Sequence, residues 1–224
     1  MEQELKGIHK HMLSLGLGAL THANWHANYS SMDNAHWSEL SVIQAAHAAE
    51  ILIKARIAQE HPLLIFETVP KSNDSKKLLG LDLLIEGGRT FQYSDLPTRL
   101  WATTGIKIPN LKLYLSFGRL RNTIQHFTTP DQDVSQDAIE FIYGVIDPFI
   151  QECWELFAVD FNEDHEPYVY LVENIISHGV RFLVSPGVVE NLEHTELAWP
   201  KDNKKYKLEM IKRFKAAGST LDFE

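Results

Sequence analysis

Residues 37–60 read WSELSVIQAAHAAEILIKARIAQE, and their apolar side chains recur at the three- and four-residue spacing of an α-helix. The stripe consists of Val42, Ala46, Ala49, Ile53 and Ile57. Asp33 or Asn34, which precede the stretch, can accept hydrogen bonds from the first backbone N–H groups of a helix. The pattern predicts one long helix that is buried along one side.

Helical patterns fill most of the chain on both sides of this stretch. Helices are expected over residues 5–28, 95–104, 111–127, 136–157, 168–177 and 204–215. Gly16 and Gly18 weaken the first of these, and Pro148 is expected to kink another. Residues 61–92 break the pattern and are expected to form a long loop or a short insertion, and a loop is expected around 185–187. No segment alternates as a strand would, so the predicted fold class is all-α.

Composition excludes several classes of protein. The chain has 224 residues, of which 44% are hydrophobic and 23% are charged, as in ordinary globular proteins. Its single cysteine, Cys153, rules out an internal disulfide and a cysteine-based zinc site, and we expect it to pack as a small apolar residue in a reducing compartment. The acidic N-terminus does not resemble a signal peptide, and no apolar run reaches the roughly 18 residues of a membrane span. We therefore expect a cytoplasmic protein without a membrane partner.

The charge is distributed unevenly. A formal net charge of −9 disfavours a surface that coats nucleic acid broadly, but it allows a local basic cleft. Residues 123–179 contain no lysine or arginine. The basic residues of the tail are Lys201, Lys204, Lys205, Lys207, Lys212, Arg213 and Lys215. Two solvated helix faces that pair with one another would explain this distribution, and so would a tail that grips RNA phosphate.

The helix expected over residues 111–127 carries two apolar stripes. The stripe expected to face the core is Leu113, Phe117, Leu120, Ile124 and Phe127. The stripe on roughly the opposite side is Leu111, Leu115, Gly118, Asn122 and His126. A helix buried on one face only would not be expected to carry two leucines and a glycine on its back. We therefore predict that the back of this helix meets a second copy of the chain, with Gly118 permitting close approach.

The same helix ends in Arg121-Asn122-Thr123-Ile124-Gln125-His126, which combines an anion-binding group, a polar positioning group and a group that titrates near neutral pH. The bare spacing is a weak signal, because Arg56 and His61 also match it. That second match lacks the asparagine and runs into a proline, so its side chains are expected to straddle a helix end at the surface.

With these helices placed, the sequence resembles the HEPN family (higher eukaryotes and prokaryotes nucleotide-binding). Three stretches carry the resemblance: AAHAAEILIKA at 45–55, GRTFQYSDL at 88–96, and LRNTIQHF at 120–127. Together they span about residues 35–157. The resemblance implies an antiparallel helical bundle over residues 1–157, followed by a C-terminal helical extension over 158–224 that we expect to tune the choice of substrate or partner.

Family members with this motif are typically metal-independent endoribonucleases of toxin–antitoxin, CRISPR or other antiviral defence systems. Their motif helices meet across a homodimer and form one composite site, in agreement with the second stripe. The resemblance therefore implies an RNA substrate, a homodimer and an antitoxin or defence-system partner. Thr128 stands where toxins neutralised by a small nucleotidyltransferase often carry tyrosine, so that mode of neutralisation is not implied.

RNA carries its own nucleophile in the 2′-OH, so such an enzyme needs only to move protons and stabilise charge. His126 is the candidate for proton transfer, and Arg121 is the candidate for holding the oxyanions of the transition state. Asn122, four residues before His126, is expected to orient the phosphate or the imidazole. No metal and no cofactor is expected. The simpler alternative is a surface arginine and histidine on a polar helix face.

Two further groups have both a structural and a functional interpretation. Glu50 lies four residues before Lys54, so it either forms a helical ion pair or holds Arg121 in place. His22 and His26 have the spacing of metal ligands on a helix, but no HExxH motif accompanies them and carboxylates are sparse nearby. Trp25, which lies between them, is expected to pack in the core. For the protein as a whole, the alternative to a ribonuclease is a non-catalytic HEPN-like helical dimer that binds nucleotide, RNA or a protein partner.

Overall fold

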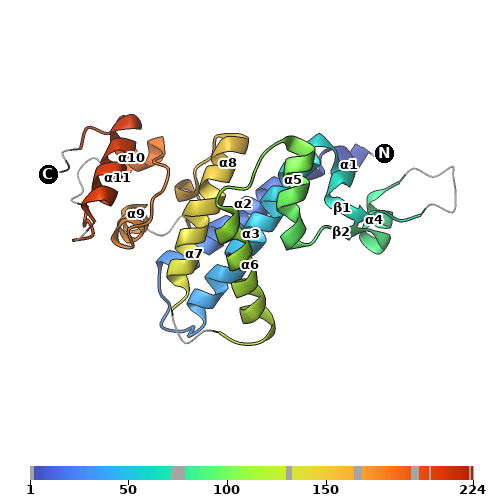
Figure 1. Cartoon of the computed structure of the whole chain (residues 1–224), viewed down its shortest axis with the longest axis horizontal. Helices are drawn as coiled ribbons and strands as arrows, with labels where there is room; N and C mark the ends of the chain where they lie inside the picture. Colours follow the sequence, from blue (N-terminus) through green and yellow to red (C-terminus); the bar gives the residue numbers. More distant parts are fainter. Residues whose placement is uncertain are drawn as a thin grey trace. The chain divides into compact units, whose positions relative to one another are not determined.

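The computed structural model describes residues 3–71, 79–129, 133–163, 168–192, 197–201, 203–221 and 223. The described chain is mostly helical, with little strand, which confirms the all-α fold class (Figure 1). The HEPN-type bundle stays a prediction. None of its helices is long and apolar enough to cross a membrane. The chain divides into two compact units: the first comprises Met1–Leu17 and His47–Ile108, and the second comprises Gly18–Ala46 and Pro109–Glu224.

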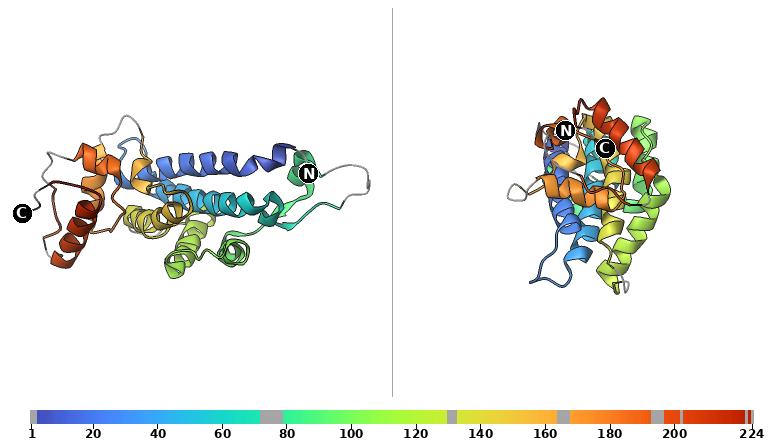
Figure 2. Two further views of the ribbon diagram at one scale, coloured as in Figure 1. Left: turned by 90° about the horizontal axis from the view of Figure 1, so that it is seen from above. Right: turned by 90° about the vertical axis from the view of Figure 1, so that its left-hand side faces the viewer.

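Helices α1 (Gln3–Lys6), α2 (Ile8–Asn28) and α3 (Trp37–Glu60) match the two N-terminal helices expected from the sequence. Helices α2 and α3 run side by side (Figure 2). Within the first unit, a Cβ atom on Gly16 would lie 2.8 Å from Cγ of Leu52. Gly16 is therefore required for the close approach of the two helices, although it lowers the helical propensity of its own segment.

The apolar stripe of α3 is confirmed. Each of its five predicted members is buried, with at most 3% of the residue exposed. The members are Val42, Ala46, Ala49, Ile53 and Ile57. Helical spacing alone was sufficient to predict which residues of α3 are buried, because α3 is packed along the whole length of the stripe.

The insertion between α3 and the next helices is more ordered than predicted. It contains the 3₁₀-helix η1 (Pro62–Ile65), strand β1 (Phe66–Thr68), helix α4 (Leu81–Gly87) and strand β2 (Arg89–Thr90). The strands pair antiparallel, with Phe66 opposite Thr90. Of the two expectations for this segment, a long loop or a short insertion, the structure shows the insertion, and its strands are too short to show alternation in the sequence.

The first unit ends with η2 (Tyr93–Asp95) and α5 (Leu96–Thr104), which stops at Gly105 in a left-handed conformation. Arg99 of α5 donates from Nε to the carbonyl oxygen of Leu64 at 2.8 Å, and its guanidinium lies 4.8 Å from the centroid of the Phe91 ring. These contacts attach α5 to the insertion.

The second unit is built around α6 (Leu111–His126) and a long interrupted helix. The interrupted helix consists of α7 (Ser135–Phe141), the π-helical turn η3 (Ile142–Ile146) and α8 (Asp147–Trp154). Pro148 has no backbone N–H to offer the carbonyl group of Gly144, and its ring clashes with that carbonyl in a regular helix. A π-helical turn lies just before Pro148, and the kink expected at this residue stays a prediction.

Beyond α8 the chain continues through η4 (Ala158–Asp160), α9 (Tyr168–Ser177), α10 (Pro186–Asn191) and α11 (Lys204–Ala216). Helix α10 replaces the loop expected around residues 185–187. Ser185 accepts a hydrogen bond from the Val188 N–H group, and Pro186 occupies the first turn, so the residues taken as loop formers are a helix start.

Residues 158–183 are joined to the rest of the second unit by buried polar groups. The Asp147 carboxylate, which is fully buried, accepts hydrogen bonds from the backbone N–H groups of Ala158 and Leu183, both at 2.8 Å. Asn24 of α2, also fully buried, donates to the carbonyl oxygens of Ala158 and Phe161 at 2.8 and 2.7 Å. The division into a bundle over 1–157 and an extension over 158–224 stays a prediction.

Candidate functional site

Helix α6 begins and ends at well-defined signals. Asn110 adopts a left-handed conformation with φ of 48°, and its side chain accepts a hydrogen bond from the Leu113 N–H group at 3.4 Å. At the other end, the Thr123 carbonyl oxygen accepts from the N–H groups of both Phe127 and Thr128 at 2.9 Å. The motif Arg121–His126 therefore forms the last turns of the helix.

The inner face of α6 is fixed by aromatic packing. Phe117 stacks on Phe141 of α7 with 3.9 Å between ring centroids and 6° between ring planes. Tyr114 is fully buried, and its ring centroid lies 6.3 Å from that of Phe141. The Cδ2 atom of Leu113 lies 3.3 Å from the Cβ position at Gly144 of the π-helical turn. These contacts set the rotation of α6 about its own axis.

The residues that this rotation buries differ in part from the stripe that was predicted to face the core. The buried residues of α6 are Tyr114, Phe117 and Gly118. Phe127, expected in the core, is 87% exposed, because it lies beyond the last helical turn and no longer follows the helical spacing. Gly118, expected at the dimer seam, is buried within the single chain.

The other members of the second stripe remain accessible. Leu111 is 48% exposed, Leu115 is half-buried, and Asn122 and His126 are exposed. Four residues of an α-helix cover roughly 400°, so Asn122 and His126 share one face. This face of α6 is available to a substrate or to a second chain.

Arg121 lies to the side of that face. It is half-buried, and its Nη1 atom donates to Oε1 of Gln125 at 3.1 Å. Its direction from the helix axis is roughly 140° from that of His126, since five residues separate the two. Helix geometry therefore brings Asn122 and His126 together on one face and directs Arg121 towards the inner face.

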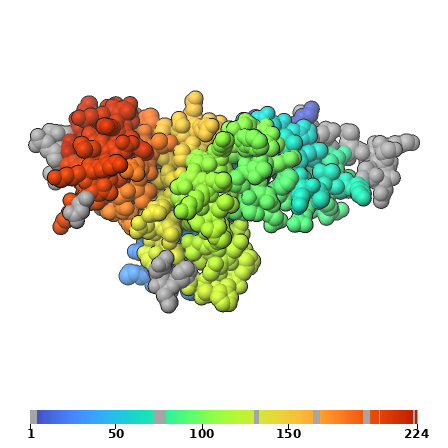
Figure 3. Space-filling model, in the orientation of Figure 1, coloured from blue at the N-terminus to red at the C-terminus, as the bar shows by residue number. Residues whose placement is uncertain are grey.

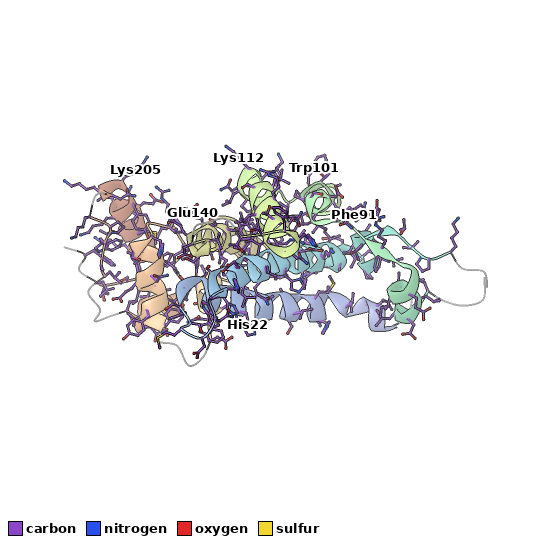
Figure 4. All side chains as sticks on the ribbon, turned by 90° about the horizontal axis from the view of Figure 1, so that it is seen from below. His22, Phe91, Trp101, Lys112, Glu140 and Lys205 are labelled. Atoms are coloured by element: carbon purple, nitrogen blue, oxygen red, sulfur yellow. The ribbon has the colours of Figure 1, made fainter. Side chains whose placement is uncertain are left out.

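The structure adds a cation that the sequence reasoning missed. Arg119 is exposed and lies seven residues before His126, so it returns to the same face two turns earlier. Lys112 is also exposed, and Figure 4 shows its side chain extending from the free side of α6. Residues 111–129 contain no Asp or Glu, although the whole chain carries a net charge of −9. Helix α6 is a locally basic strip, and the seven-residue spacing of Arg119 and His126 was the available signal.

Glu50 forms the helical ion pair. Its Oε1 atom accepts from Nζ of Lys54 at 2.7 Å, and the same Nζ donates to Oγ1 of Thr90 at 3.1 Å. Only 9% of Lys54 is exposed, so this pair neutralises a buried ammonium group at the edge of the β ladder. A role for Glu50 as a partner of Arg121 stays a prediction.

The second sequence match is divided by a helix end, as predicted. Arg56 lies in α3 and forms an ion pair with Glu60 at 2.8 Å. His61 follows the end of α3, is exposed, and accepts a hydrogen bond from the Leu63 N–H group through its side chain. Both side chains have structural partners on the first unit.

His22 and His26 take part in an aromatic cluster. Nδ1 of His22 lies 3.2 Å from Oε1 of Glu163, and Nδ1 of His26 donates to the His22 carbonyl oxygen at 2.7 Å. No group of three or more metal-ligating side chains occurs among the described residues.

The chain was compared with models of known protein families, with curated proteins and with solved structures, and none of the three comparisons found a match.

Proposed function

We propose that this protein is a metal-independent endoribonuclease that acts as a homodimer. The observation that carries the proposal is the accessible face of α6, where Asn122 and His126 lie on a helix with exposed cations and without acidic residues. Single-stranded RNA offers phosphates to the cations and a 2′-OH to the imidazole.

The reaction is an internal transfer at phosphorus. His126 removes the 2′-OH proton, and the 2′ oxygen forms a bond to the neighbouring phosphorus. The bond from phosphorus to the 5′ oxygen breaks, and that oxygen takes up a proton. The products are a 2′,3′-cyclic phosphate and a 5′-hydroxyl. Asn122 orients the phosphate from the adjacent turn, and Arg119 on the same face stabilises the charge on its non-bridging oxygens, together with Arg121 of the second chain.

Two features favour a composite site made by two chains. One histidine would have to serve as both base and acid, whereas a dimer supplies two. In addition, Arg121 and His126 diverge on one helix, so a second copy is a natural source of the missing group. Leu111 and Phe127 provide exposed apolar surface at the two ends of α6, which suits a helix-to-helix seam. We propose that the biological context is a toxin or antiviral defence module with a neutralising or activating partner.

The proposal is tested by incubating the protein with single-stranded RNA in EDTA and analysing the ends of the products. Cyclic phosphate and 5′-hydroxyl ends are expected, and DNA of the same sequence should remain intact because it lacks the 2′-OH.

The alternative is a non-catalytic dimer that uses the same basic face only to bind. The hydrogen bond from Arg121 to Gln125 favours it, because this guanidinium already has a structural partner within its own helix. Crosslinking of RNA to α6 without cleavage, under every condition that supports binding, would decide for this alternative.

A further inference from the structure

A polar cleft of about 490 Å³ lies within the second unit, apart from the face of α6 described above. It is bounded by the end of α2, the connection between α2 and α3, the residues around the start of α7, and α9. Blue atoms of this part of the chain are visible at the lower left of Figure 3. The cleft has the volume of ordinary small-molecule sites.

One wall of the cleft is aromatic. The ring centroids of His26 and Trp37 are 4.3 Å apart, and Trp25 supports Trp37 edge-on at 4.8 Å. The indole N–H of Trp37 is buried and donates no hydrogen bond to any described residue. A flat ligand can pack on this wall.

Two of the residues that line the cleft are histidines, His26 and His178, and the Nδ1 atom of each is hydrogen-bonded to a backbone carbonyl oxygen. Nδ1 of His26 lies 2.7 Å from the His22 carbonyl oxygen, and Nδ1 of His178 lies 2.8 Å from the Asn174 carbonyl oxygen. A carbonyl oxygen only accepts, so each Nδ1 carries the hydrogen and the Nε2 of the neutral ring is an acceptor. Burial lowers the pKa of His26 from its ordinary value, which keeps this ring neutral at pH 7.

Amide and hydroxyl groups complete the lining, and cations are absent from it. Asn34 accepts a hydrogen bond from the His36 N–H group through its side-chain oxygen, so its amide N–H groups remain to donate. Among the described lining residues, Asp133 is the one with a formal charge, and none is lysine or arginine. Phosphate and carboxylate groups would find no counter-charge here.

We propose that this cleft binds an uncharged nucleobase. A nucleobase is planar, carries donors and acceptors around a rigid edge, and has no charge that requires a cation. Those properties match an aromatic wall with histidine acceptors and amide donors. The base comes either from a free nucleoside or from an unstacked position in a single strand of RNA. The nucleoside form of the proposal does not depend on the ribonuclease activity.

The test is a calorimetric titration of the full chain with adenosine, guanosine, cytidine and uridine, with ribose and the nucleoside 5′-monophosphates as comparators. Saturable binding of at least one nucleoside is expected, with weaker binding of its 5′-monophosphate and none of ribose. Absence of saturable nucleoside binding would overturn the proposal, and so would tighter binding of the monophosphate.

Variants locate the binding. Trp37→Ala should weaken it about tenfold or more, which is the usual effect of removing an aromatic partner of a base. Asn34→Asp keeps the acceptor for the His36 N–H group but removes the amide donors, so it should weaken binding without unfolding the chain. The matched control is Trp101→Ala, since Trp101 is 55% exposed in the first unit and should leave binding unchanged. Binding that survives both cleft variants at full strength would contradict the assignment.

A competition experiment identifies the source of the base. Nucleoside bound to the wild type is challenged with a short single-stranded RNA. Displacement assigns the cleft to a base of the strand, and retention assigns it to a free nucleoside. A protein that binds nucleoside but does not cleave RNA would contradict the ribonuclease proposal and leave the nucleobase proposal standing. The two proposals can therefore fail separately.

Discussion

Phe117 of α6 and Phe141 of α7 lie face to face, with ring centroids 3.9 Å apart and ring planes 6° from parallel. This stack decides which side of α6 is turned inward. The turn that carries Asn122 and His126 is then turned outward, so the accessibility of the candidate site depends on a core contact made by a residue outside the motif.

The first prediction concerns that contact. Phe117→Ala removes a ring that is 2% exposed, and the free energy of unfolding should fall by about 3–5 kcal/mol, as for other large-to-small changes in a core. Denaturant titration measures the loss. Tyr170→Ala is the control, because Tyr170 is 57% exposed and its removal should change stability by about 0.5 kcal/mol or less. Equal effects of the two substitutions would show that the stack does not hold α6.

The second prediction concerns Asp147, whose pKa burial raises from 3.8 to about 7. The folded chain then binds a proton between about pH 4 and 7 that the unfolded chain has released. The contribution of Asp147 to the free energy of unfolding should therefore fall as the pH rises through this window and level off above it.

Other carboxyl groups titrate in the same range, so the informative quantity is the difference between the wild type and Asp147→Asn, measured by denaturant titration at several pH values. The amide can accept from one of the two N–H groups of Ala158 and Leu183, so the variant should be less stable by about 1–3 kcal/mol. The difference should be largest at low pH and shrink towards pH 7. A difference independent of pH would mean that Asp147 is ionised throughout.

The third prediction concerns the dimer. Leu111→Glu places a carboxylate in the first turn of α6, where the helix dipole favours it, so the single chain should remain folded. A carboxylate buried in the seam without a counter-charge should weaken association by about tenfold or more, as followed by sedimentation. Leu208→Glu on α11 is the control, because Leu208 is 62% exposed and lies outside the proposed seam. A wild type that is monomeric at micromolar concentration would contradict the seam directly.

The helices were largely predictable, because burial along most of them follows regular spacing. The short strands, α10 and the position of Phe127 were not, since each depends on a helix end or on pairing between distant residues. For the site, the sequence placed Arg121, Asn122 and His126 on one helix. It could not show that Arg121 is half-buried or that Gly118 is buried, because the rotation of α6 is set by tertiary packing with Phe141. The residues of the polar cleft in the second unit come from four separate segments, and no spacing pattern in the sequence links them.

The fourth prediction concerns phosphate contacts on α6. Arg119→Ala should weaken the binding of single-stranded RNA about equally for all sequences, and it should lower the slope of log K against log salt by roughly 0.7. Lys10→Ala is the control, because Lys10 is exposed on α2 in the first unit and belongs neither to α6 nor to the basic tail. Anisotropy titrations at several salt concentrations give both quantities. An unchanged salt slope would show that Arg119 does not contact phosphate.

The most direct test of the central claim is cleavage of single-stranded RNA in EDTA by the wild type, His126→Ala and Arg121→Ala, with Arg56→Ala and His61→Ala as controls from the second sequence match. We expect 2′,3′-cyclic phosphate products from the wild type, a loss of activity of at least about a hundredfold in the His126 and Arg121 variants with the dimer intact, and full activity in the two controls. Cleavage that requires added metal, or full activity of His126→Ala, would contradict it.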